Sequence, residues 1–153
     1  MAPPAKSGKS RIKTMNEEII LEAALEMFSR FGFRGTTVEE IARQAGMSKP
    51  NLLYYFKSKD DIYVAVLERT LSQWLRPLTE IDPAGDPIEE LRRYITAKIE
   101  MSRSNPLASR LFANEILQGA PKIAGVLTGP LKDLVDRKAE TIRGWIAAGK
   151  IAA

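Results

Sequence analysis

Lys49, Asn51 and Tyr54 are the residues of this 153-residue chain whose types and spacing point most directly to a chemistry. They stand in the stretch SKPNLLYYF, where a serine followed by a proline predicts the start of a short helix over about 49 to 54. The two leucines fall on its apolar side, which leaves these three residues facing outward. In a DNA major groove a lysine reaches guanine acceptors and an asparagine pairs with adenine. The pattern predicts a helix that reads base edges, although a solvated helix face would look similar.

A second short helix is predicted directly before the first. Thr37 and Glu40 have the spacing of a capping box, and the apolar residues between 38 and 45 recur on one helical face. Gly46 supplies the positive φ that ends this helix, and Ser48 caps the next one. The two predicted elements form a helix-turn-helix, which places its second helix in the major groove.

Four residues around the reading helix are expected to contact phosphates, namely Thr36, Thr37, Tyr55 and Lys59. Such contacts fix the position of a protein on DNA and add salt-dependent affinity without sequence information. The expected DNA-contacting set is therefore Thr36, Thr37, Ser48, Lys49, Pro50, Asn51, Tyr54, Tyr55 and Lys59.

Composition narrows the other possibilities. The chain has no histidine and no cysteine, so it lacks the commonest general base and metal ligand as well as any thiol chemistry. It also has no glycine-rich phosphate loop and no clustered carboxylates, so we expect neither an enzyme nor a bound cofactor or metal. The net charge of +4 permits nucleic-acid binding. No apolar run approaches the roughly 20 residues of a membrane span, and the N-terminus lacks a signal-peptide core, so a soluble cytoplasmic protein with no membrane partner is expected.

The rest of the chain shows helical periodicity without strand alternation, so the predicted fold is all-α. Residues 1–13 read as a disordered basic arm, which could follow the DNA backbone or serve as a solubilising tail. Residues 14–60 are expected to form a three-helix DNA-binding head, and residues 61–153 a second helical domain.

The second domain begins within a long helix predicted from Ser58 to Leu78, which ends before the breaker-rich linker DPAGDP. Asp86 and Pro87 then start a helix whose inward side is expected to carry Ile88, Leu91, Ile95 and Ile99. Further helices are predicted to start at Pro106 and Pro130.

The run FSRFGFRGTTVEEIARQAGMSKPNLLYYFKSKDDI resembles the TetR family of transcriptional regulators. Lys57 departs from that pattern, because the family often has proline there. The resemblance implies double-stranded operator DNA as a partner, a small-molecule effector and a homodimer in the full-length protein. The matching positions are Phe28, Gly32, Thr36, Thr37, Ile41, Ala42, Ala45, Gly46, Ser48, Tyr55, Phe56, Lys59 and Ile62.

Later runs, including LSQWLRPL and LTGPLKDLVDRK, are similar to a branch of this family that represses pyrimidine breakdown genes and senses uracil or thymine. This similarity implies an effector cavity among the C-terminal helices. Trp74 could stack on a flat ring or could be plain core, and Lys98 and Glu115 could hydrogen-bond the ring or remain surface charges. The expected effector-binding set is Trp74, Leu78, Lys98, Phe112 and Glu115.

Proteins of this branch continue through two further long helices that make most of the dimer interface. We therefore expect a fragment with an incomplete second domain, and expect residues 1–153 alone neither to form a tight dimer nor to bind a pyrimidine well. Two other functions fit parts of the sequence. A regulator of efflux or stress genes with a lipophilic ligand would share the whole architecture, whereas a helical protein-interaction module would leave the helix-turn-helix unexplained.

Overall fold

The structure is a computed structural model that describes residues 8–152, and within this range it contains helices and no strand. The predicted all-α fold is confirmed. The chain divides into two compact units, Met1–Val66 and Leu67–Ala153, so the boundary lies later than the one expected after residue 60. No helix in the described part is both long and apolar enough to span a membrane.

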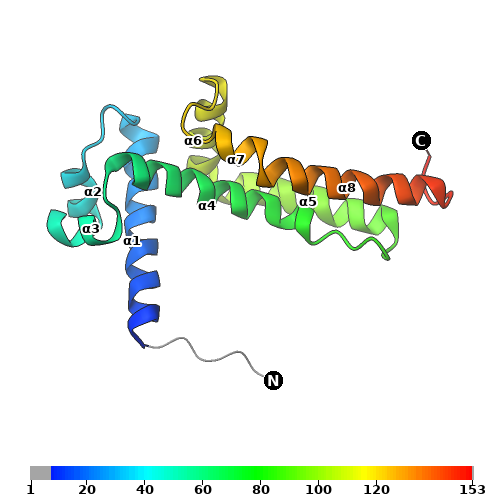
Figure 1. Ribbon diagram of the computed structural model, residues 1–153, viewed down its shortest axis with the longest axis horizontal. Helices are drawn as coiled ribbons and strands as arrows, with labels where there is room; N and C mark the ends of the chain where they lie inside the picture. Colours follow the sequence, from blue (N-terminus) through cyan, green and yellow to red (C-terminus); the bar gives the residue numbers. More distant parts are fainter. Residues whose placement is uncertain (1–7, 153) are drawn as a thin grey trace. The chain divides into compact units, whose positions relative to one another are not determined.

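The first unit contains α1 (Gly8–Phe31), α2 (Val38–Gln44), α3 (Lys49–Tyr55) and the first turns of α4 (Lys59–Thr79) (Figure 1). Helix α1 starts earlier than predicted, so residues 8–13 are helical rather than part of a disordered arm, and residues 1–7 lie outside the described range. Residues 9–13 contain neither glycine nor proline, and Lys13 forms an i,i+4 ion pair with Glu17. The Thr14 hydroxyl donates to the Ser10 carbonyl at 3.0 Å, inside this helix.

An aromatic cluster closes the core of the first unit. The ring of Tyr63 in α4 lies edge-on to Phe28 of α1 at 4.9 Å and to Phe33 at 5.0 Å, measured between centroids. Ile41 of α2 and Leu52 of α3 are fully buried. Each helix of this unit thus contributes apolar side chains to one core, which holds α3 in place.

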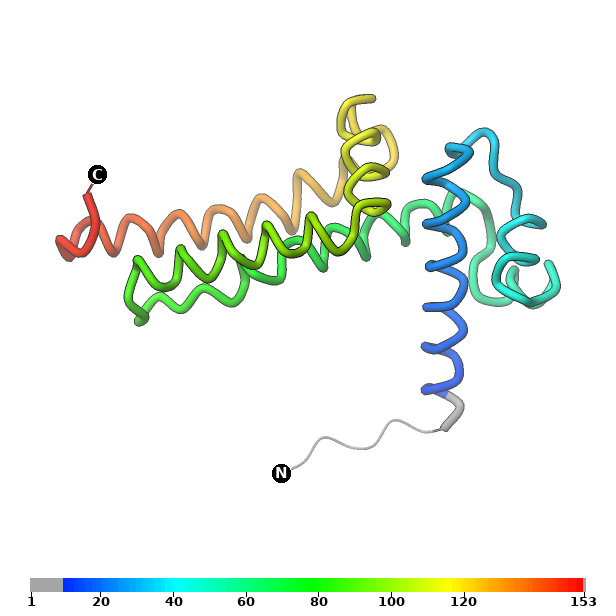
Figure 2. Tube along the Cα trace, turned by 180° about the vertical axis from the view of Figure 1, so that it is seen from behind, coloured from blue at the N-terminus to red at the C-terminus, as the bar shows by residue number. Residues whose placement is uncertain are grey.

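The second unit contains the remainder of α4 together with α5 (Pro87–Ser104), α6 (Pro106–Leu117), α7 (Ala124–Thr128) and α8 (Pro130–Ala147). Figure 2 shows α5 and α8 running alongside the second half of α4. The predicted helix starts at Pro106 and Pro130 are confirmed, and the Asp86 side chain caps α5 by accepting from the backbone N–H groups of Ile88 and Glu89. Leu71, Leu111, Ile123 and other buried residues form the core of this unit.

Three of the four apolar residues expected on the inward side of α5 are exposed instead, which corrects the sequence-based expectation, while Leu91 is half-buried. Ile88, Ile95 and Ile99 are each more than half exposed, at 54%, 54% and 56%. The inward side instead carries Glu90 and Lys98, because both find backbone partners there: Glu90 accepts from the Asp82 N–H, and Lys98 donates to the Trp74 carbonyl. Helical periodicity defines a stripe, and these polar contacts decide which side of the helix is covered.

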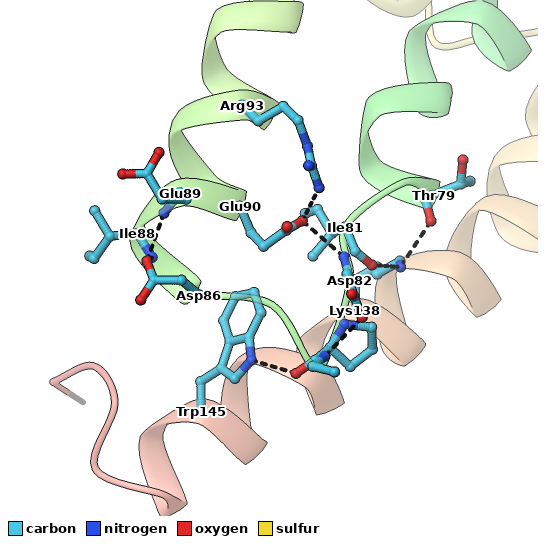
Figure 3. Close-up of polar contacts among 12 residues, drawn as sticks. Thr79, Ile81, Asp82, Asp86, Ile88, Glu89, Glu90, Arg93, Lys138 and Trp145 are labelled. Carbon is cyan, nitrogen blue, oxygen red and sulfur yellow. Dashed lines mark hydrogen bonds and ion pairs between the residues drawn. The ribbon is translucent and has the colours of Figure 1, made fainter.

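The linker between α4 and α5 is held by side chains of α8 (Figure 3). The Lys138 ammonium donates to the carbonyls of Thr79 and Ile81 at 3.1 and 2.9 Å, and the Trp145 indole N–H donates to the Pro83 carbonyl at 2.9 Å. The first two bonds satisfy carbonyls at the C-terminal end of α4, where a positive charge is also favourable. The breaker-rich linker is therefore tied to α8.

We expect Lys138→Met to lower the free energy of unfolding by about 1 to 2 kcal/mol, because it removes two charge-assisted hydrogen bonds from the end of α4. Lys132→Met is the matched control, since Lys132 pairs with Asp136 of its own helix at an exposed position, and it should leave the urea midpoint unchanged. Equal midpoints for the two variants would contradict the role assigned to Lys138.

Candidate DNA interface and effector site

Local sequence builds α3 as predicted. Gly46, with φ of +69°, stands in the turn after α2, and Ser48 caps α3 by accepting a hydrogen bond from the Asn51 N–H at 3.3 Å. Pro50 lies in the first turn, where no intrahelical N–H is lost. The short helix is thereby fixed at its N-terminus, the end from which recognition helices contact bases.

The three expected base-reading residues are on the accessible side of α3. Asn51 is exposed, Tyr54 is 77% exposed, and the Lys49 side chain is 47% exposed, while Leu52 between them is fully buried. This distribution agrees with the outward placement expected from the sequence. Their contact with bases remains a prediction.

Tyr55 has a partner that the sequence analysis did not find. Its hydroxyl accepts a hydrogen bond from the Asn16 amide of α1 at 2.7 Å, and its ring lies edge-on to Tyr54 at 5.2 Å between centroids. Because the hydroxyl accepts this bond, its own hydrogen can donate to a phosphate oxygen. No local pattern marks Asn16, which lies 39 positions away in the chain. The phosphate role of Tyr55 remains a prediction, now with Asn16 as the group that orients it.

The two threonines before α2 hold the ends of helices through their hydroxyls, and their expected contact with phosphates remains a prediction. Thr36 is fully buried, and its hydroxyl lies 2.8 Å from the Gly32 carbonyl and 3.2 Å from that of Met27. Thr37 forms the predicted capping box: its hydroxyl accepts from the Glu40 N–H and donates to the Glu40 carboxylate. The hydroxyls of both residues are therefore engaged within the first unit.

Lys59 is also turned toward the protein. Its ammonium donates to the carbonyls of Phe33 and Thr36 at 2.8 and 2.9 Å and lies 4.4 Å from the centroid of the Phe33 ring. These contacts join the start of α4 to the turn between α1 and α2. These contacts favour a role of Lys59 in positioning this turn, and its expected contact with a phosphate remains a prediction.

Lys49 forms an ion pair with Glu39 of α2, and the two side chains are 47% and 60% exposed. The hydrogen bond from Lys49 is the main reason why the pKa of the Glu39 carboxyl lies below its usual value. Sequence reasoning did not predict the pairing of Lys49 with Glu39, because it depends on how the turn folds α3 against α2.

In the second unit, three of the five expected effector-binding residues lie together. The rings of Trp74 and Phe112 are 5.7 Å apart between centroids, and the Lys98 ammonium lies 5.1 Å from the Trp74 ring centroid and donates to the Trp74 carbonyl at 2.9 Å. Burial lowers the pKa of the Lys98 ammonium. The Trp74 indole N–H is buried and has no hydrogen-bond partner among the described residues.

The other two expected residues have different surroundings. Leu78 is half-buried and lies one helical turn beyond Trp74 in α4. Glu115 is 3% exposed, and its carboxylate accepts from the Lys122 N–H at 2.8 Å, which ties the segment after α6 to that helix. Glu115 is therefore neither a solvated charge nor available on all sides, and its contact with an effector remains a prediction.

A groove of about 550 Å³ lies elsewhere in the second unit. It runs between α4, α7 and α8, and none of the expected effector residues lines it. Its lining includes four leucines together with Arg76 and Arg137. Its residues include Leu71, Leu75, Val126, Leu131, Leu134 and Arg137.

Comparison with known proteins assigns families to both units. The family described as bacterial regulatory proteins, tetR family, matches residues 20–66, and the family described as YcdC-like protein, C-terminal region, matches residues 67–153. The HTH-type transcriptional regulator RutR of Escherichia coli K12 is 49% identical over 144 residues, which cover 94% of this chain and 68% of RutR. An HTH-type regulator in the dhlA 5′ region of Xanthobacter autotrophicus is 39% identical over 157 residues, covering 98% of this chain and 75% of that protein.

Solved structures agree with this assignment. A TetR-like transcriptional regulator from Rhodococcus sp. RHA1 superposes with a TM-score of 0.69 at 26% identity, covering 88% of this chain and 73% of that one. The similarity thus extends through both units.

Proposed function

This chain belongs to the tetR family of bacterial regulatory proteins and is a transcriptional regulator, not an enzyme. On this basis we propose that it represses genes of pyrimidine catabolism and is released from DNA by uracil or thymine. The family assignment already implies operator DNA, a small-molecule effector and dimers. The pyrimidine effector and pathway are our proposal, and the similarity to RutR supports them. We place the protein in the cytoplasm, where its DNA target would be.

The observation that carries the DNA-binding role is the outward face of α3, on which Lys49, Asn51 and Tyr54 are exposed beside a capped N-terminus. We propose that these three side chains read bases and that Tyr55 contacts a phosphate.

Lys49→Ala should weaken binding to the preferred duplex by about 1 to 3 kcal/mol and change binding to random DNA far less, because a base contact is lost. Tyr55→Phe should weaken binding to the preferred duplex and to random DNA alike, since it removes the hydroxyl that we expect to contact a DNA phosphate. Fluorescence anisotropy on a duplex selected from a random pool and on the pool itself measures both. Equal losses on the two probes for both variants would refute the division between base and phosphate contacts.

The unpartnered Trp74 indole N–H supports the effector proposal. A buried donor without an acceptor is costly, and a bound ligand that carries a carbonyl oxygen would supply one. Uracil and thymine are flat rings with two carbonyl oxygens, so they could stack on Phe112 and accept hydrogen bonds from the Trp74 indole and from Lys98. An effector held here would contact α4 directly, and α4 continues into the first unit. We propose this shared helix as the route by which the effector alters DNA binding.

A thermal-shift comparison tests the effector site. Uracil and thymine should raise the melting temperature of the full-length protein, and Trp74→Phe should abolish this rise because it removes the N–H that lacks a partner. Trp145→Phe is the matched control, since the indole N–H of Trp145 already donates to Pro83, and it should keep the response to uracil. Loss of the response in both variants, or in neither, would count against Trp74 as the effector donor.

The apolar groove between α4, α7 and α8 favours a second candidate, a regulator that answers to a lipophilic ligand. The same assay distinguishes the two candidates when a set of lipophilic cations is included. A shift with these cations and none with pyrimidines would favour the second candidate and leave the DNA-binding role intact.

A further inference from the structure

We propose that Glu39 is a specificity-determining residue of the DNA interface. Its carboxylate holds the Lys49 ammonium against α2, so that Lys49 is released to guanine acceptors at a matching site but contributes little to binding on other sequences. This inference rests on the proposed role of α3 in reading DNA.

The pair joins two helices that are separately fixed. Glu39 lies in the first turn of α2, which the Thr37–Glu40 capping box holds, and Lys49 is the first residue of α3, which Ser48 caps. The Lys49 ammonium contacts the Glu39 carboxylate directly across the turn. Lys49 must therefore break its contact with the Glu39 carboxylate before its ammonium can reach DNA.

The Lys49–Glu39 ion pair contributes little to the stability of the fold. Both side chains are about half exposed, and exposed ion pairs contribute little to folding. The helix does not need Glu39 as a cap, because the neighbouring Glu40 performs that function. A carboxylate beside a DNA-reading lysine is, however, unfavourable for every DNA sequence, because it repels phosphates and competes for the ammonium. Such a residue raises specificity when its cost is larger for the wrong partners than for the right one.

Discrimination between DNA sequences depends on which new contact replaces the broken Lys49–Glu39 ion pair. A phosphate offers Lys49 one anionic partner in place of another, so exchanging Glu39 for it brings little net gain. A guanine at the matching site offers Lys49 two acceptors, O6 and N7, in the major groove. The other base contacts of α3 form at the same time. Glu39 should thus weaken binding to random DNA more than binding to the preferred site.

Glu39→Gln tests this inference, because it removes the charge and keeps the shape. On a pool of random duplexes of about 20 base pairs, two helical turns, we expect affinity to rise about 3-fold to 10-fold and the logarithmic salt slope to steepen by about one. Affinity for a duplex selected by the native protein should rise less, so the ratio between the two affinities falls. The control is Glu26→Gln, which removes an equal charge from a carboxylate of the same unit that pairs with Arg30 and accepts from Gln44.

A double-mutant cycle separates action through Lys49 from a general field effect. In a Lys49→Met background, Glu39→Gln should no longer change the affinity ratio or the salt slope. An unchanged ratio in the single variant, an equal change with Glu26→Gln, or an effect that persists without Lys49 would each overturn the proposal. If the native protein showed no salt-dependent binding to any duplex, the proposed DNA-binding function would itself be wrong, which is a different result.

Discussion

Replacing Leu52 by alanine is expected to lower the free energy of unfolding of the first unit by about 2 to 5 kcal/mol and to abolish specific DNA binding. Leu52 is fully buried and is the buried residue of α3, a helix of 7 residues. A helix this short has little stability of its own and depends on its packing. The cavity that Leu52→Ala leaves would therefore loosen α3 and displace its three base-reading residues.

The neighbouring leucine offers the control. Leu53 is only half-buried, so Leu53→Ala should cost clearly less and should leave specific binding measurable. Urea unfolding followed by circular dichroism, together with anisotropy on the selected duplex, gives both readouts. Similar losses for the two variants would show that Leu52 is not what anchors α3.

Lys59→Met is expected to lower the free energy of unfolding by about 2 to 3 kcal/mol, because two carbonyls of the turn before α2 lose a charged donor and the Phe33 ring loses its cation. The salt slope of DNA binding should stay unchanged at temperatures where the variant is folded, since no phosphate contact is lost. The methionine keeps most of the apolar length of the lysine, so the effect reports on the ammonium.

Lys57→Met removes the same charge two positions away and gives the opposite expectation. Lys57 is exposed, and if it lies near a phosphate its loss should flatten the salt slope by about one without lowering the melting temperature. A flatter slope with Lys59→Met, at unchanged stability, would restore Lys59 to the phosphate contacts and refute its role in positioning the turn.

Features that depend on neighbours within one helical turn were predictable from the sequence. Ser48 caps α3, Thr37 and Glu40 form a capping box, and Ser58 with Asp61 caps α4, as their spacing indicates. Gly46 has the positive φ that the turn requires. Each of these depends on a side chain bonding to backbone two or three residues away, or on the steric freedom of a single residue, so the order of the helices could be inferred without knowledge of the fold.

Only the tertiary structure decided which way the polar side chains turn. Lys59 and Thr36 look like phosphate ligands in the sequence, but the carbonyls that bind Lys59 come from residues 26 and 23 positions away. The Trp145 indole donates to a carbonyl 62 positions away. Helix α5 turns its own Glu90 and Lys98 inward and leaves its isoleucines exposed. Helical periodicity identifies a face but not its neighbour, and a buried polar group is stable only where the fold brings it a partner.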